Sequence, residues 1–523
     1  MKLAITSFSG EIPRIEARLL ATTNAQIANG VKLEDGSMLP MRQAREVESL
    51  GSSPQTIYLN GDDWLTWPGI VSVAPAPIAE NRLYVTDDGA PKIIAGAVTY
   101  ELAVPAPSGA LTASISSTPD PELSQTVLYT YTWVTELDEE SEPAPLSAGL
   151  VWSEGIDVLL SGFALPPGGR GIDRQRIYRS QISALGETLL YLIAEQSVSA
   201  SDWTDVVADN PIQELLPSLE YNPPPSGLSG LIAMPNGMMA AFVGKRLYFC
   251  EPWRPHAWPE KYILTTDYEI VGLGAFGSSL AVMTTGQPYI VTGTAPDTMS
   301  MEKLEVNLPC LARRGIVDLG YSIAYPSPDG LVIINTSGAQ LASGSIMTRD
   351  QWQALNPSSF VASCFAGRYI MSYTPSAGPA GTIIVDMTGE QRFITHAPDV
   401  ASAMFSEIGT GALFYVSGDT IREWEAQGQE PHLFTWRSKK FVLEGYKNFG
   451  ALLAYADPSY GGSAPNFAVN IYADETLLHS TGVMNEVTRL PAGRRARIWE
   501  IEIVTNCRVH QVAIANSPSE FVS

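Results

Sequence analysis

AAFVGKRLYF (residues 240–249) consists of an apolar strand, a glycine turn and a second apolar strand, and this unit recurs four more times before Glu425. The turn glycines lie 42, 44, 51 and 37 residues apart. Repeats of about 40–45 residues made of short strands are typical of β-propellers, because one blade cannot bury both of its faces alone. Glycine at each turn permits the positive φ that tight hairpins need. The further copies are LAVMTTGQPYIV (280–291), IAYPSPDGLVII (323–334), YIMSYTPSAGPAGTIIV (369–385) and LFYVSGDTIREW (413–424).

These repeats predict an all-β chain whose residues 226–430 form a propeller-like body. A plain β-sandwich with chance regularity is the alternative. NRLYVTDDGAPKII (81–94) has the same strand–turn–strand pattern, so it would supply another blade or a strand that closes the ring. The remainder of residues 1–121 reads as an irregular segment with strands and one short helix, from Arg14 to Ala28.

Two further β domains are expected. In residues 122–221, VLYTYTWVT (127–135) alternates and places aromatic side chains on one face, as in the strand of a sandwich. This segment resembles the fibronectin type III-like modules of many phage structural proteins. Residues 431–523 alternate cleanly, and RIWEIEIV (497–504) has one apolar and one partly polar face, which indicates a sandwich or platform domain facing solvent or a partner.

Composition limits the functions that the chain can have. Its 523 residues include 32 Lys and Arg against 55 Asp and Glu, a net charge of −23, which argues against a free-standing nucleic-acid binder but not against passage of DNA. The four cysteines are far apart, so buried thiols in a reducing compartment are expected, without a zinc site or disulfides. The first residues lack a signal-peptide core, and no run of eighteen apolar residues predicts a membrane span.

A family resemblance covers most of the chain in the same order. PRIEARLLATTNAQIANGVKLEDGSMLPMR (13–42), the DDWLTWPGIVSV stretch from residue 62, RLYFCEPWRPHAWPEKY (246–262), WRSKKF (436–441) and RLPAGRRARIWEIEI (489–503) are similar to the tail nozzle, or tail hub, proteins of short-tailed bacteriophages. The resemblance implies a virion tail protein, assembled in the host cytoplasm as a homohexameric ring below the portal and its adaptor. The ring would conduct the genome and dock tail fibres, spikes or a needle.

The candidate catalytic and binding residues have simpler structural explanations. SPDG (327–330) is explained as a turn. The carboxylate pairs Asp62–Asp63, Asp87–Asp88 and Glu139–Glu140 occur in turn-like contexts, so we expect solvated loop charges. His256, between Trp253 and Trp258, is expected to pack in a connection between blades rather than to bind a sugar or a partner loop. No catalytic set, metal site or cofactor is predicted, and the protein is not expected to be an enzyme.

Assembly contacts are therefore the predicted sites. Arg494, Arg495 and Arg497 would pair with acidic residues of a neighbouring subunit or of the adaptor, and Trp253 and Trp258 form an aromatic pair that would hold a partner. The alternative function is a carbohydrate-binding or glycan-degrading propeller.

Overall fold

Nearly every element of the computed structural model is a β-strand, which confirms the all-β class. The structure describes residues 1–78, 81–182, 187–207, 214–389, 391–458, 460 and 464–521. Its α-helix, α1 (Arg349–Ala354), begins at the cap Thr348 and has only six residues. No helix in these ranges is long and apolar enough to cross a bilayer. The chain forms two compact units, Met1–Ile70 with Ala281–Ile290 and Lys303–Ser523, and Val71–Leu280 with Val291–Glu302.

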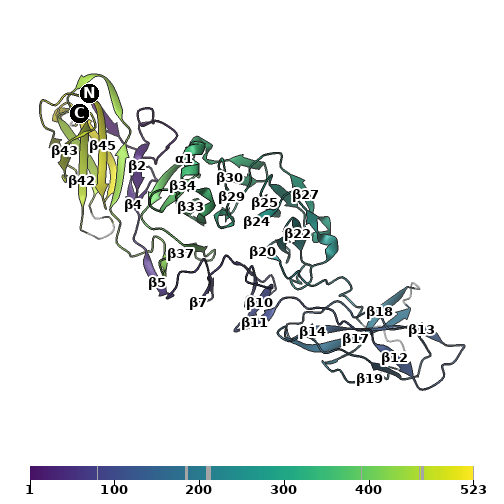
Figure 1. The fold of residues 1–523 in the computed structure, drawn as a ribbon. Helices are drawn as coiled ribbons and strands as arrows, with labels where there is room; N and C mark the ends of the chain where they lie inside the picture. Colours follow the sequence, from purple (N-terminus) through teal and green to yellow (C-terminus); the bar gives the residue numbers. More distant parts are fainter. Residues whose placement is uncertain are drawn as a thin grey trace. The chain divides into compact units, whose positions relative to one another are not determined.

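Four four-stranded sheets, and the first four strands of a ten-stranded sheet, share one plan, in which four consecutive strands pair with their sequence neighbours (Figure 1). The repeated unit is always the two middle strands, and residues 81–94 supply the middle strands of a sheet of their own. The division between the two units passes through the third sheet. The sheets are β8 (Ser72–Pro75), β9 (Arg82–Thr86), β10 (Lys92–Ala95) and β11 (Val98–Glu101); β20 (Ser229–Ala233), β21 (Met239–Val243), β22 (Arg246–Phe249) and β23 (Leu264–Thr265); β24 (Ile270–Phe276), β25 (Ser279–Thr284), β26 (Tyr289–Thr292) and β27 (Ser300–Lys303); β28 (Val317–Asp318), β29 (Ile323–Ser327), β30 (Gly330–Asn335) and β31 (Gly338–Leu341); and β32 (Val361–Phe365), β33 (Arg368–Tyr373), β34 (Gly381–Asp386) and β35 (Phe393–Ala397).

A sixth sheet has the same plan, but its fourth strand comes from far away in the sequence. It joins β36 (Ala403–Ser406), β37 (Leu413–Ser417) and β38 (Thr420–Glu423) to β5 (Arg45–Ser49). Every side chain of β5 is exposed, so its backbone pairing and the ion pairs Arg45–Glu423 and Arg422–Glu46 hold it in place.

Neighbouring sheets pack face to face, which explains why their middle strands are apolar on both sides. In one unit, Tyr84 and Ile93 of β8–β11 share a core with Met239 and Ala241 of β20–β23. In the other, Ile333 of β30 meets Met371 and Ile383 of β32–β35, and Ile370 and Ile384 on the opposite face meet Leu413 and Tyr415 of β37. Such two-sided burial is typical of blade-like stacking.

Two of the five turn glycines have the positive φ expected of a tight hairpin, Gly244 at 59° and Gly418 at 67°. Gly330 has φ 149° and is the first residue of β30, whereas Gly286 and Gly381 do not have positive φ. At Gly381 the requirement is space, since a Cβ there would lie 2.7 Å from the hydroxyl of Tyr373. The conformational freedom that glycine permits is thus used at only some of these turns.

The sandwich within residues 112–205 begins ahead of the expected boundary at residue 122, because β12 pairs with β16. Tyr129, Tyr131 and Trp133 point into its core, as the alternation predicts. Its sheets are β12 (Thr112–Ile115), β16 (Val158–Ser161) and β19 (Trp203–Asp205); β13 (Gln125–Val127) and β15 (Leu150–Trp152); and β14 (Tyr129–Thr135), β17 (Ile172–Ile182) and β18 (Thr188–Ser197).

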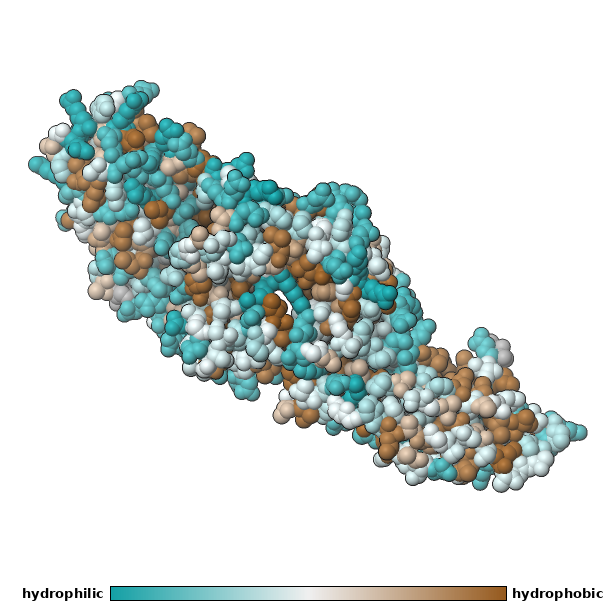
Figure 2. Space-filling view, viewed as in Figure 1, coloured by the Kyte–Doolittle hydropathy of each residue, from teal (hydrophilic) through white to brown (hydrophobic). Residues whose placement is uncertain are grey.

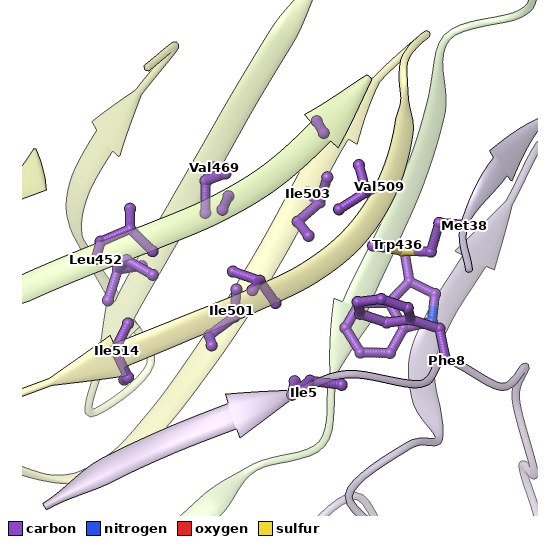
Figure 3. Packing of buried hydrophobic residues seen from close by; sticks show 14 of the residues in the cluster. Ile5, Phe8, Met38, Trp436, Leu452, Val469, Ile501, Ile503, Val509 and Ile514 are labelled. Atoms are coloured by element: carbon purple, nitrogen blue, oxygen red, sulfur yellow. The ribbon is translucent and has the colours of Figure 1, made fainter. Parts of the chain in front are cut away.

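The C-terminal sandwich includes strands from both ends of the chain. Figure 3 shows its core, where Ile5 and Phe8 from the N-terminal segment join Ile501, Ile503 and other apolar residues of the last strands. One sheet contains β1 (Lys2–Ile5), β46 (Arg508–Ala515), β41 (Ala451–Asp457) and β44 (Thr488–Arg489). The other runs from β35 through β2 (Ala25–Asn29), β39 (Phe434–Ser438), β45 (Ala496–Thr505) and β42 (Phe467–Ala473) to β43 (Thr476–Thr481), with β40 (Phe441–Lys447) paired to β45.

The predicted helix from Arg14 to Ala28 is absent from the structure, which has turns there followed by β2. A helix of this length is marginal in water without an apolar face to bury, and Leu19 is left exposed here. Pairing with β39 satisfies the backbone of residues 25–29 instead. The remaining strands are the short pairs β3 (Val31–Lys32) with β4 (Leu39–Pro40) and β6 (Thr56–Asn60) with β7 (Asp63–Trp67).

Candidate assembly surfaces

The strand β40 lies at an edge of the C-terminal sandwich. It pairs with β45, and the described residues provide no strand on its other side. Phe441 and Leu443 turn toward the core, whereas Val442 and Tyr446 point outward, and Tyr446 is 67% exposed. An edge strand with free backbone groups and apolar side chains is a template for pairing with another chain.

The three predicted arginines lie beside this edge. Pairing of Lys447 with Ala496 brings the end of β40 next to the loop before β45 that carries Arg494 and Arg495. Within the described ranges, the exposed side chains of Arg494 and Arg495 have no ion-pair partner. Arg497 differs, because its Nε donates to the carbonyl oxygen of Leu443 at 3.1 Å. The sequence prediction thus placed three cations together, and the structure adds the edge strand as their neighbour.

Most polar groups on the partly polar face of RIWEIEIV have partners within the chain, although the buried Oε1 of Glu500 has none among the described residues. Glu500 is buried and accepts from Arg437 Nε at 3.1 Å and from Gln26 Nε2 at 2.7 Å. Glu502 accepts from the hydroxyl of Tyr472 at 3.0 Å, and the Arg437 guanidinium lies 4.1 Å from the centre of the Tyr472 ring. These contacts stabilise the sheet across β2, β39, β42 and β45.

The two predicted tryptophans have different environments. Trp253 is 56% exposed and adopts φ 62°, with its indole against Gly237, where a Cβ would lie 2.3 Å from the ring. Trp258 is only 2% exposed and packs in the core formed by β8–β11 and β20–β23, its Nε1 donating to the carbonyl oxygen of Pro255 at 2.7 Å. Trp258 therefore cannot contact a partner, because its ring is enclosed within the chain.

His256 is buried, in keeping with the expected packing role. Its Nε2 lies 3.2 Å from the carbonyl oxygen of Glu140, and its ring makes an edge contact with Tyr221. Burial lowers the pKa of His256 to about 3, assisted by the charge of Arg254. The imidazole is thus neutral at physiological pH.

The expectation of solvated loop charges is wrong for Glu139 and Glu140, although Asp62 and Asp63 are exposed. Glu140 is buried and accepts hydrogen bonds from the hydroxyls of Thr132 and Tyr178, at 2.8 and 2.7 Å, and pairs with Arg176 at 3.0 Å. Adjacent residues in a strand or turn can both be buried when two packed faces enclose them, which the local sequence does not reveal.

Glu139 is also buried, but fewer hydrogen bonds and charges stabilise its carboxylate than stabilise that of Glu140. Burial raises its pKa to about 7, and the nearby Arg82 only partly opposes this effect. Its Oε1 has no hydrogen-bond partner within the described residues. A raised pKa can mark a functional acid, and burial together with the charge of Glu139 also raises the pKa of the neighbouring Tyr84.

The sequence analysis missed a surface of exposed apolar residues on the sandwich of β12–β19. Figure 2 shows brown, hydrophobic residues gathered over this module at the lower right of the view. The exposed apolar side chains of the module are Leu123, Leu146, Val151, Leu159, Leu165, Ile182 and Val206. Leu165 and Leu123 lie in loops, where apolar periodicity carries no signal.

Other sequence features have structural roles. Ser327–Gly330 forms the turn between β29 and β30, and Asp329 pairs with Arg349 at 2.8 Å. All four cysteines are free thiols, and three of them are buried. Among the described residues, no group of His, Cys, Asp and Glu is arranged to hold a metal ion.

Comparison with known proteins identifies no relative by sequence, since neither a family model nor a curated protein matches the chain. Among solved structures, the N-terminal domain of Nup159 is similar over 95% of this chain and all of its own, with 7% identity and a TM-score of 0.31. The extracellular domain of a hybrid two-component system from B. thetaiotaomicron matches 83% of this chain, which spans 43% of that structure, with 8% identity and a TM-score of 0.21. Because both TM-scores are below 0.5, these likenesses define neither the fold nor the function.

Proposed function

We propose that this chain is a structural protein of a phage tail that assembles as a ring, in agreement with its resemblance to tail nozzle proteins. The observation that carries the proposal is the open edge of β40, where Val442 and Tyr446 are exposed beside the unpaired Arg494 and Arg495. A homohexamer is the expected stoichiometry, because the resemblance implies it.

The edge and its arginines suit a chain of this charge. Each subunit carries a net charge of −23, so neighbouring subunits repel one another at long range. A cluster of arginines at the contact would meet acidic surface of the next subunit or of the adaptor, while strand pairing and apolar contact supply short-range attraction. The contact is thus built from complementary charge on an otherwise like-charged molecule.

An acidic ring also suits a conduit for DNA. A bore lined by Asp and Glu repels the phosphate backbone, so no contacts would hold the genome as it passes. A map of the ring should show a net acidic bore wider than a duplex, roughly 20 Å across. A bore lined by Lys and Arg would contradict the conduit function.

Assembly is tested by native mass spectrometry of the purified chain, alone and with the portal–adaptor complex. The wild-type protein should form a closed ring, and replacing both Val442 and Tyr446 by Lys should leave monomers with an unchanged thermal unfolding midpoint. The matched control is Leu477→Lys on β43, another exposed apolar residue at a sheet edge, which should not disturb the ring. A wild-type monomer with no affinity for the complex would contradict the proposal.

A further inference from the structure

A polar cavity of about 420 Å³ lies where three blade-like sheets begin. Arg314, just before β28, Val361 at the start of β32, and Ser402, just before β36, contribute to its wall. The first strands of these sheets are neighbours, β32 packing beside both β28 and β36. All of these residues belong to one compact unit, so the cavity is formed within a single packed body.

The charge of the lining is unusual for this protein. Among the described residues that line the cavity, Arg314 carries a charge and there is no Asp, Glu or Lys. This lining contrasts with the whole chain, in which acidic residues outnumber basic ones. Its Nη2 donates to the carbonyl oxygens of Gln55, at 3.2 Å, and of Ser402. Among the described residues, Arg314 forms only these two hydrogen bonds and no ion pair, so no carboxylate balances its charge. A half-buried guanidinium without a counter-ion favours an external anion.

The other polar groups of the wall are hydroxyls and an amide. Ser53, Ser359, Thr374 and Ser402 supply hydroxyl groups that both donate and accept, and Gln55 adds a side-chain amide. Such groups suit ligand hydroxyls. The volume lies within the range of about 300–1,000 Å³ that is usual for small-molecule sites, and it leaves room for a sugar-sized ring beside an anionic group.

We propose that this cavity binds a small polyhydroxylated oxyanion, a sugar acid or a sugar phosphate, with Arg314 on the anionic group. The guanidinium fork matches both carboxylate and phosphate, so the chemistry shared by the two ligands is an oxyanion carried on a hydroxylated ring. This binding site is separate from the assembly edge at β40 and does not depend on ring formation.

Isothermal titration of the full chain distinguishes the ligand classes. Glucuronate and glucose 6-phosphate should each bind more tightly than methyl glucoside, which lacks the anion, and more tightly than inorganic phosphate, which lacks the ring. A preference between the first two identifies the anion. Equal affinity for methyl glucoside and glucuronate, or no binding of either anionic sugar, would overturn the proposal.

The variant Arg314→Gln should weaken the preferred anionic sugar about tenfold or more, because a charge-assisted contact is lost. Arg349→Gln is the matched control, since Arg349 is an exposed arginine of the same unit that already pairs with Asp329. The Arg349→Gln protein should bind the anionic sugar as tightly as the wild type does.

A second measurement needs no variant. Wild-type crystals soaked in selenate should show anomalous selenium density beside Arg314, since selenate presents the same oxyanion. Density elsewhere with none in the cavity would overturn the assignment even if Arg314→Gln failed to fold.

Discussion

Arg179 and Asp205 form an ion pair in the core of the β12–β19 sandwich. Arg179 Nη1 donates to Asp205 Oδ2 at 2.8 Å, the hydroxyl of Tyr129 donates to the same oxygen at 2.9 Å, and the guanidinium lies 4.7 Å from the centre of the Trp152 ring. Both side chains are almost completely enclosed. A buried ion pair becomes costly when one of its partners is removed.

Asp205→Asn should therefore destabilise the protein by about 3–5 kcal/mol, because it removes the buried carboxylate that both Arg179 and the hydroxyl of Tyr129 contact. Asp138→Asn is the control, since Asp138 pairs with Arg174 at 2.7 Å but is 82% exposed, and a loss below about 1 kcal/mol is expected. Urea unfolding followed by tryptophan fluorescence measures both changes. An equal decrease in the free energy of unfolding for the two variants would show that the buried ion pair stabilises the protein no more than the exposed one.

Glu139 makes stability depend on pH. Burial raises its pKa from the ordinary value of 4.5 to about 7 in the folded protein, so between these pH values the folded state retains a proton that the unfolded state releases. The favourable contribution is complete below pH 4.5 and is lost as pH rises through 7, by up to about 3 kcal/mol. Glu139→Gln should remove this decline and unfold at a higher temperature than the wild type at pH 8.

Calorimetry of wild type and variant at pH 5 and pH 8 isolates the Glu139 contribution, because the difference cancels other groups. His256, with its pKa near 3, acts in the opposite direction and removes stability as pH falls below 6.5. Asp62→Asn is the control, since Asp62 lies exposed in the turn between β6 and β7. A Glu139→Gln protein that keeps the wild-type slope would contradict this explanation.

At the scale of elements, the strands of the first seventy residues each complete a sheet built by the later chain. β1 pairs with β46, β2 with β39, and β5 with β38. Phe8, between β1 and β2, packs edge-on against Trp436 with ring centres 5.0 Å apart, as Figure 3 shows. The C-terminal sandwich therefore depends on an N-terminal segment that no local pattern links to it.

Phe8→Ala should cost about 3–5 kcal/mol, because it leaves a cavity beside Trp436 in the sandwich core. Leu19→Ala is the control from the same segment, since Leu19 is 74% exposed and its loss should fall within about 0.5 kcal/mol. Hydrogen exchange adds a local test, because only Phe8→Ala should speed exchange in both β1 and β39. Unchanged protection of β39 would contradict the proposed role of this contact.

At the scale of the whole molecule, the net charge of −23 sets the salt response of the proposed ring. Replacing Arg494 and Arg495 by Glu should prevent assembly in dilute buffer, and 1 M NaCl should partly restore it, because screening then acts within about 3 Å. Tyr446→Ala removes apolar contact instead, so salt should not restore its ring. Native mass spectrometry after rapid buffer exchange, or light scattering in each buffer, measures both. Restoration of neither variant would exclude a charge-dependent contact at this edge.

The all-β class and the five repeated hairpins could be predicted from local sequence patterns. Both follow from local physics: glycine and short apolar strands specify hairpins, and two-sided apolar runs such as IAYPSPDGLVII require stacking on both faces. The aromatic face of Tyr129, Tyr131 and Trp133 was likewise predicted by alternation alone. The cluster Arg494–Arg497 was visible as charge in the sequence, and its exposure in the structure is consistent with the prediction.

Which distant segments meet could not be predicted from such patterns. β5 joins β38, Trp258 enters the core, Glu139 and Glu140 become buried, and residues 25–29 form a strand where a helix was predicted. The cavity at Arg314 likewise arises from segments that the sequence separates by hundreds of residues. Local patterns record how a segment distributes its own apolar residues, whereas burial and pairing depend on the surface that another segment presents, and that surface exists only after folding.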